Sequence, residues 1–441
     1  MSSADCPFTI VGAGLAGGLL ACHLGKAGRR VHLYEERPDP RSTEIDQGRS
    51  INLAISVRGI HALRQVGLAD DVLARAIPMR GRMMHDRHGQ LTFQPYGKDD
   101  SESIHSVSRG ELNRLLIEAA DRFDTVSLTF ERKCTGVDLH ERTIELADRA
   151  GKHESIEAAC LIGSDGAYSA VRAQLQKLER FDFAQAYLSH GYKELTMPAA
   201  AGGTHAMEKH ALHIWPRQSF MMIALPNLDG SFTCTLFWPF EGPNSFASIK
   251  DEKDLLALFQ REFPDVLPLM PGLAADYFGN PTGALVTVRC APWHVEDKVV
   301  LLGDAAHAVV PFLGQGMNAA FEDCTVLADC LAQAPHDRAA AFRAYQARRK
   351  VHTDVLADLC VDNFLEMRDK VGSKWFVLRK KLDVFLHRLL PGIYEPLYTL
   401  VTFTRTPYAD ALRRARIQEA ILRGSAGLLL LVILLLLFTP W

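Results

Sequence analysis

Three glycines at fixed spacing near the start of the chain constrain its fold most. Gly12, Gly14 and Gly17 form a GxGxxG pattern between the apolar run 7–12 and a helical pattern over 14–27. The first glycine permits a tight turn, the second lets backbone approach a pyrophosphate, and the third lets helix and strand pack closely. The motif predicts a Rossmann-like dinucleotide-binding unit whose helix N-terminus attracts the anion.

An acidic residue stands where such a unit needs one. Glu35 ends a second apolar run, 31–35, and is placed to accept hydrogen bonds from ribose hydroxyls; Arg37 follows it. A glycine turn with a purely structural role can show the same GxGxxG spacing. With strand, helix and acid together we favour dinucleotide binding, and at this point NAD and FAD fit equally.

A second segment, LIGSDGAYSAVR (161–172), places Asp165 and Gly166 after an apolar run and leads through Ala170 to Arg172. Taken alone, it could be a strand–turn–helix junction with an aspartate cap and a surface arginine.

A third segment runs from LLGDAAH (301–307) to PFLGQGMN (311–318). Asp304 follows the strand pattern 298–303 and can accept from a ribityl hydroxyl. Gly314 and Gly316 let amides at the next helix start approach the pyrimidine end of a flavin. His307 could be a catalytic acid, but we favour a histidine hydrogen-bonded within the turn.

The order of patterns predicts an α/β fold with three parts. Strand patterns at 7–12, 31–35, 160–164 and 298–303 alternate with helical ones at 14–27 and 109–123, which indicates a parallel sheet. We expect a discontinuous Rossmann-like domain (1–184 and 291–335), with part of 50–110 contributing to a substrate pocket. We expect an inserted, mostly antiparallel β-sheet substrate domain (185–290), a helical C-terminal region (336–424) and an apolar tail (425–441).

Charge and cysteine content exclude several classes. The net charge of −3 gives no basic excess for nucleic acid. Nine scattered cysteines without metal-ligand spacing predict neither a disulfide framework nor a metal site, and favour a reducing, intracellular compartment. The first apolar run reads as a strand, so we expect no signal peptide.

The tail AGLLLLVILLLLF (426–438) carries no charge and follows a cluster of arginines. Thirteen helical residues reach about 20 Å, short of the roughly 30 Å hydrocarbon core. A buried core helix or a groove-filling tail is the alternative, but a soluble helix normally keeps a polar face. We therefore expect membrane association through residues 426–441 in an otherwise cytoplasmic protein.

The three segments, in this order and spacing, resemble the FAD-dependent aromatic hydroxylases that fold like para-hydroxybenzoate hydroxylase. The resemblance implies one FAD, held mainly by the first and third segments, and NADPH as reductant without a separate domain. Within that group the chain resembles the kynurenine 3-monooxygenase family along nearly its whole length. The carrying segments include GRSINLAIS (48–56), PMRGRMMH (78–85), SFTCTLFWPF (231–240), GDAAHAVVPFLGQGMNAAFEDC (303–324) and PLYTLVTFTR (396–405).

That resemblance assigns the site residues. Arg82 and Tyr96 would hold the substrate carboxylate, and Asn363 and Tyr398 would complete the substrate pocket, which suits carboxylate chemistry. Without the resemblance, Arg82 would read as an exposed strand arginine and the tyrosines as core. The cofactor positions would be Gly12, Gly14, Ala16, Gly17, Glu35, Arg37, Ala54, Arg109, Cys134 (through its backbone), Asp165, Ala170, Asp304, Gly314, Gly316, Met317 and Asn318.

The family reaction implies that L-kynurenine, NADPH and O₂ give 3-hydroxy-L-kynurenine through a flavin C4a-hydroperoxide, in tryptophan degradation or NAD biosynthesis. The ring amine activates the attacked carbon, so we assign no catalytic side chain. One alternative is a related hydroxylase acting on another carboxylate-bearing aromatic amine. Another is a flavin-binding sensor or scaffold whose tail docks a partner, and no segment resembling a signalling domain supports it.

Overall fold

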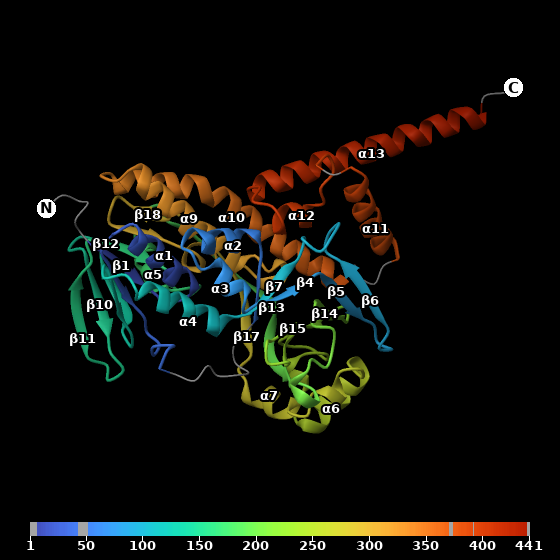
Figure 1. Ribbon diagram of the computed structural model, residues 1–441, viewed down its shortest axis with the longest axis horizontal. Helices are drawn as coiled ribbons and strands as arrows, with labels where there is room; N and C mark the ends of the chain where they lie inside the picture. The colour runs from blue at the N-terminus through green and yellow to red at the C-terminus, as the bar shows by residue number, and fades with distance from the viewer. Residues whose placement is uncertain (1–6, 43–51, 370–373, 391, 439–441) are drawn as a thin grey trace.

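A computed structural model describes residues 7–42, 52–369, 374–390 and 392–438, of which 367–369, 374–377, 380–381 and 426–438 are described by their backbone alone (Figure 1). Its first layer is a six-stranded sheet in the order β18-β19-β12-β1-β2-β8, parallel except for β18. The strands are β1 (Phe8–Val11), β2 (Val31–Tyr34), β8 (Val126–Thr129), β12 (Cys160–Gly163), β18 (His294–Val295) and β19 (Val299–Leu301). The predicted parallel sheet is confirmed.

Helices cover this sheet because its central strands, β1, β12 and β19, are buried on both faces. They are α1 (Leu15–Lys26), α4 (Arg109–Ala120), α5 (Ala170–Leu175), α8 (Asp304–His307) and α9 (Gly316–Gln333). Ser108 caps α4 by accepting from the amide of Glu111, and Ser169 caps α5 in the same way through Arg172. One continuous apolar core joins these helices to the sheet.

A seven-stranded sheet, ordered β17-β13-β16-β15-β14-β5-β6, forms the second layer. Its strands are β5 (Gly81–His85), β6 (Leu91–Pro95), β13 (Asp182–Met197), β14 (Ala211–Pro216), β15 (Met221–Pro226), β16 (Phe232–Pro239) and β17 (Gly283–Ala291). All neighbours are antiparallel except β14 and β5. The mostly antiparallel insertion is confirmed; the domain boundaries at 184/185 and 290/291 stay a proposal.

Two helices within the inserted segment were not predicted from the sequence. They are α6 (Glu252–Glu262) and α7 (Leu273–Gly279), with the short 3₁₀ turns η1 (Ala201–Gly203), η2 (Phe246–Ser248) and η3 (Leu267–Leu269) nearby. Phe259, Phe263 and Tyr277 pack with Trp215 and Trp238 into a separate core. These aromatics pack on one face of the seven-stranded sheet, and residues on its opposite face line a cavity.

Two small sheets complete the strands. One contains β9 (Lys133–Asp138), β10 (Thr143–Ala147) and β11 (His153–Glu157); the other contains β3 (Asn52–Ile55), β4 (Ile77–Met79) and β7 (Ile104–Ser108). Helices α2 (Val57–Gln65) and α3 (Ala69–Leu73) follow β3. The β3-β7-β4 sheet brings residues 52–54 to the junction between the two large sheets.

The C-terminal region is helical, as predicted. It contains α10 (Arg338–Asp369), α11 (Lys374–Leu389), α12 (Leu397–Thr402) and α13 (Tyr408–Phe438), after the turn η4 (Pro311–Leu313). Figure 1 shows α13 leaving the body of the molecule as one long helix toward the C-terminus. None of the helices is long and apolar enough to cross a membrane, over the part of the chain that the structure describes. The predicted tail contact falls on side chains outside that part.

Candidate flavin and substrate site

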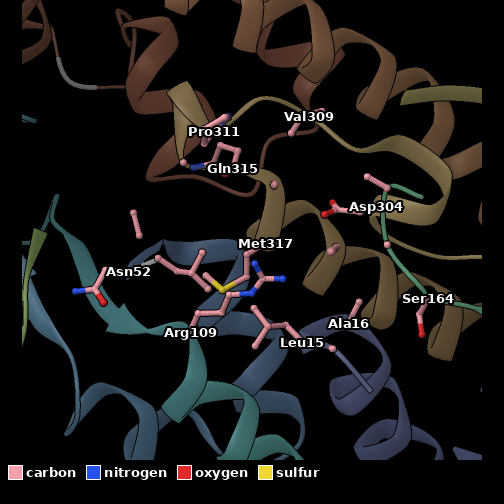
Figure 2. A pocket seen from close by; sticks show the side chains of 18 of the residues that line it. Leu15, Ala16, Asn52, Arg109, Ser164, Asp304, Val309, Pro311, Gln315 and Met317 are labelled. Atoms are coloured by element: carbon pink, nitrogen blue, oxygen red, sulfur yellow. The ribbon is translucent and has the colours of Figure 1, made fainter. Parts of the chain in front are cut away.

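A cavity of about 720 Å³ lies where the two large sheets, the β3-β7-β4 sheet and α12 meet (Figure 2). Residues from all three sequence segments line it. Of the predicted positions, those on its wall are Gly12, Gly14, Ala16, Glu35, Arg37, Ala54, Arg82, Arg109, Cys134, Asp165, Ala170, Asp304, Gly314, Gly316, Met317 and Tyr398. Gly17, Tyr96, Asn318 and Asn363 are not among the lining residues.

The GxGxxG turn has the geometry that its glycines predict. Gly12 has φ +98°, and a β-carbon there would lie 2.6 Å from the carbonyl oxygen of Ser164. A β-carbon on Gly17 would lie 1.9 Å from the carbonyl oxygen of Gly12, so only glycine lets α1 pack this closely. At Gly14 no atom lies within 4 Å of the β-carbon position. The backbone beside the start of α1 is therefore open to a ligand.

The Glu35 side chain lines the cavity and is fixed by hydrogen bonds. Its carboxylate accepts from the amide of Ala13 at 2.7 Å and from Nε of Arg37 at 2.7 Å. Burial raises the pKa of Glu35, but hydrogen bonds and charge from Arg37 outweigh burial and leave that pKa below its ordinary value. An ionised acid fixed in this position can accept from ribose hydroxyls.

The second segment forms a buried acidic turn. The Asp165 carboxylate accepts from the hydroxyl of Ser169 and from the amide of Val171 at 3.2 Å. Burial raises its pKa, partly offset by these hydrogen bonds. Arg172 is buried, not a surface residue, and donates to the carbonyls of Ala305 (2.8 Å) and Ala167 (2.6 Å). It thereby ties the second segment to the third.

Asn318 shapes the third segment from behind. Its side-chain amide donates to the carbonyls of Ala54 (2.9 Å) and Gly314 (2.8 Å), and its oxygen accepts from the amide of Ser56 (2.9 Å). Gly314 itself has φ +62°, in the left-handed region. The loop before α9 is thus fixed with Gly316 and Met317 facing the cavity.

Figure 2 shows Arg109, Met317 and Asp304 around the cavity, from α4, α9 and the start of α8. Cys134 lies on the wall and is buried; burial raises the pKa of its thiol to about 12. The thiol donates toward the carbonyl of Gly136 at 3.5 Å and, being neutral, is no nucleophile; cofactor contact through the Cys134 backbone stays a prediction.

Arg82, Tyr96 and Tyr398 come together at one end. The two tyrosine rings stack with centroids 5.4 Å apart, and the Arg82 guanidinium lies 4.8 Å from the Tyr398 ring and 5.5 Å from that of Tyr96. Arg82 Nε and the Tyr96 hydroxyl are buried without a hydrogen-bond partner of good geometry among the described residues. Asn363 lies apart from this group and donates to the carbonyl of Phe312, a cavity residue, at 2.8 Å.

His307 does not line the cavity. Its Nε2 lies 2.6 Å from the carboxylate of Asp323 on α9, so its partner is a neighbouring helix and not the turn. Arg349 of α10 bonds the other oxygen of Asp323 at 2.6 Å. His307 therefore belongs to a buried ionic network beneath the site.

Glu194 is an acid beside the site that sequence reasoning missed. On β13, Tyr192 and Glu194 pair with Phe237 and Thr235 of β16, both on the cavity wall. Directly opposed residues share a sheet face, so Glu194 lies on the cavity side of the sheet, next to residues of the cavity wall. Burial raises its pKa to about 6, while Arg109 opposes the rise. Only the strand pairing, fixed after folding, reveals this placement.

A pH-dependent stability difference follows. The unfolded carboxyl, with an ordinary pKa of 4.5, ionises before the folded one, so the folded state loses stability as pH rises from 4.5 to about 6. Glu194→Gln removes this loss. We expect the difference in melting temperature, variant minus wild type, to increase from pH 4.5 to about 6 and to stay constant above pH 7. The exposed Glu179→Gln serves as control; parallel curves for wild type and Glu194→Gln would refute the assignment.

The residues present fit FAD. Open backbone at the N-terminus of α1 suits a pyrophosphate, Glu35 and Asp304 can accept from sugar hydroxyls, and Arg109 adds a cation on the same wall. An apolar end, with Phe237 and Phe312 on its wall, leaves room for an aromatic substrate.

Comparison with known proteins agrees with this geometry. A family described as "FAD binding domain" matches residues 5–358. The chain is 49% identical over 414 residues to kynurenine 3-monooxygenase of Myxococcus xanthus (strain DK1622), covering 94% of this chain and 89% of that protein. It is 46% identical over 428 residues to kynurenine 3-monooxygenase of Dictyostelium discoideum, covering 94% and 92%.

Among solved structures, the tetrameric form of 2-methyl-3-hydroxypyridine-5-carboxylic acid oxygenase has a TM-score of 0.67 at 20% identity, covering 88% of this chain and 98% of that one. At this identity the likeness shows a shared fold. The sequence relatives go further: the chain belongs to the kynurenine 3-monooxygenase family of FAD-dependent monooxygenases.

Proposed function

We propose that this protein hydroxylates L-kynurenine to 3-hydroxy-L-kynurenine, with FAD bound and with NADPH and O₂ as co-substrates. One oxygen atom enters the ring, the other leaves as water, and NADPH is oxidised to NADP⁺. Relatives that carry this activity in their names match the chain over nearly its full length. We propose tryptophan degradation or NAD biosynthesis as its pathway.

The substrate class is inferred mainly from Arg82, which has no acidic partner among the described residues. Arg82 lines the cavity beside two stacked tyrosine rings, and none of its atoms forms an ion pair with an acid of the described residues. A guanidinium enclosed without a counter-ion is costly unless a ligand supplies one. We propose that the carboxylate of the substrate pairs with Arg82 and accepts from the hydroxyls of Tyr96 and Tyr398.

The rest of the chamber orients the aromatic ring. Leu212 and Arg82 are register partners on β14 and β5 and face the cavity together. Further apolar walls come from Ile223, Phe237 and Phe312, and Asn363 fixes the backbone at Phe312. This pocket holds the substrate ring in place and excludes water.

Bound FAD supplies the redox chemistry that activates oxygen once NADPH has reduced it. The chain holds the ring carbon beside the amine, already electron-rich, toward the flavin end of the chamber. We therefore assign no side chain as a general base. For the cofactor, we propose that Glu35 binds ribose, Asp304 the ribityl chain, and the amides beside Gly14, Gly316 and Met317 the pyrophosphate and ring.

A matched pair of ligands tests the substrate class. Kynuramine is L-kynurenine without its carboxylate, so it lacks the group proposed to pair with Arg82. We expect its half-saturating concentration for stimulating NADPH oxidation to be about two orders of magnitude higher. Equal concentrations for both ligands would refute the carboxylate assignment. Stronger stimulation by another amino-substituted aromatic acid would favour the related-hydroxylase alternative.

We also propose that the uncharged tail, residues 426–441, attaches the protein to a membrane. Support comes from its composition and from α13, which carries it away from the body (Figure 1). Truncation after Gly424 should move the protein from the membrane to the soluble fraction in detergent-free fractionation. An unchanged distribution would refute the proposal.

A further inference from the structure

One buried arginine outside the cavity joins the parts that build it. Arg58, on α2, is 1% exposed. Its Nη1 donates to Glu322 Oε1 at 2.7 Å, Nη2 donates to the carbonyl of Thr406, and Nε reaches the carbonyl of Val401 at 3.5 Å. Its guanidinium also lies 4.1 Å from the Tyr408 ring.

These contacts connect three segments that are distant in sequence. Arg58 begins only four residues after Ala54, a cavity residue on β3. Glu322 lies on α9, whose first residues, Gly316 and Met317, face the cavity. Val401 and Thr406 belong to the α12–α13 segment. A planar guanidinium can hold a carboxylate and carbonyls at fixed angles together, which a lysine cannot do.

A second contact supports the same connection. The hydroxyl of Tyr408 donates to the side-chain oxygen of Gln315 at 3.2 Å, and Gln315 is a buried residue of the cavity loop. On the far side, Glu322 also pairs with Arg349. The acid is thus held between two arginines. The α12–α13 segment is fixed to the last residue of the loop before α9 and, through Arg58, to α9 itself.

The segment that Arg58 holds carries Tyr398. This residue lies on α12, three residues before Val401, and its ring covers the guanidinium of Arg82. A shift of α12 would displace the Tyr398 ring relative to the substrate pocket. Because a helix moves as a rigid unit, the bond to the Val401 carbonyl acts one turn away from Tyr398.

We propose that Arg58 is a positioning residue for hydroxylation: it sets Tyr398, through the α12–α13 segment, at a fixed place relative to the flavin end of the cavity. The inference rests on the proposed function for the role of Tyr398. Arg58 does not line the cavity. It acts by keeping the substrate ring aligned with the oxygen-activating centre.

Variants of the full-length, FAD-loaded enzyme test this. Arg58→Met removes the charge and the fork of donors, Arg58→Lys keeps only the charge, and Arg64→Met on the exposed face of α2 is the control. We expect Arg58→Met to retain FAD, to bind L-kynurenine roughly tenfold more weakly, and to release more of its reducing equivalents as hydrogen peroxide. Arg58→Lys should be intermediate, and Arg64→Met should match wild type.

Amide hydrogen exchange gives a readout that needs no substrate. Without Arg58, amides 399–408 should exchange faster in the substrate-free holoenzyme. A wild-type enzyme that failed to hydroxylate L-kynurenine would refute the proposed function, while the exchange measurement would still test the connection. A lower melting temperature with unchanged substrate affinity, peroxide yield and exchange per FAD-loaded molecule would show Arg58 to be a structural ion pair only.

If Arg58→Met does not fold, Tyr408→Phe decides the question. It removes only the hydroxyl that donates to Gln315 and keeps the ring against Arg58. We expect a raised peroxide yield with a melting temperature close to that of wild type. A wild-type peroxide yield in this variant and in Arg58→Lys would overturn the proposal.

Discussion

Replacement of Arg82 by alanine should lower the affinity for L-kynurenine by about two orders of magnitude, as the loss of a charged pair of about 2–4 kcal/mol predicts. FAD content should stay at the wild-type level, since Arg82 packs against Tyr96 and Tyr398, which are proposed to hold the substrate and not the cofactor. Substrate titration and the flavin absorbance of purified protein measure the two quantities.

Two controls sharpen this experiment. Arg80→Ala removes an arginine two residues away whose side chain is 48% exposed beside Asp100, so it should bind substrate normally. With kynuramine, Arg82→Ala should cause little further loss, because the partner of the arginine is already absent. Loss of flavin from Arg82→Ala would instead place this residue in the cofactor site.

The second large effect concerns stability. Asp323 is fully buried and lies 2.6 Å from both His307 Nε2 and Arg349 Nε. Asp323→Ala leaves the buried Arg349 with one acid fewer, and breaking such a pair costs about 3–5 kcal/mol. We expect a clear fall in the melting temperature of the holoenzyme. Asp358→Ala, which breaks an exposed pair with Arg289, should cost at most about 1 kcal/mol.

The pH dependence of this network has a definite sign. Burial raises the pKa of Asp323, but His307 and Arg349 outweigh burial and hold it below its ordinary value. The stabilisation is therefore present above the pKa of the unfolded carboxyl and is lost as pH falls toward the folded one. Wild type and Asp323→Ala should approach each other in melting temperature in acid. A constant gap at every pH would contradict the ionic account.

Local patterns predicted the parts of the fold that depend on neighbours in sequence. The glycines of the first turn and Glu35 report a strand–turn–helix unit, because each acts within its own segment. The β-rich, aromatic segments that form β14–β16 likewise indicated an inserted, mostly antiparallel sheet. Helices α6 and α7 were missed because their helical pattern was surrounded by stronger strand patterns.

Residues that act over long separations could not be found in this way. Arg58 meets Thr406, and Asn318 meets Ser56, only after the chain has folded. Glu194 lies on the cavity side of the sheet because of its pairing with Thr235, and a one-residue change of register would turn it to the other face. Arg82 was assigned from family resemblance, since an arginine on a strand is usually exposed; the cavity explains why this one is enclosed.

The most direct test of the account is to measure NADPH oxidation by FAD-loaded protein with and without L-kynurenine and to identify the product. We expect L-kynurenine to stimulate NADPH oxidation and to be converted to 3-hydroxy-L-kynurenine, with one product formed for nearly every NADPH consumed. NADPH oxidation that yields only hydrogen peroxide, with L-kynurenine recovered unchanged, would contradict it.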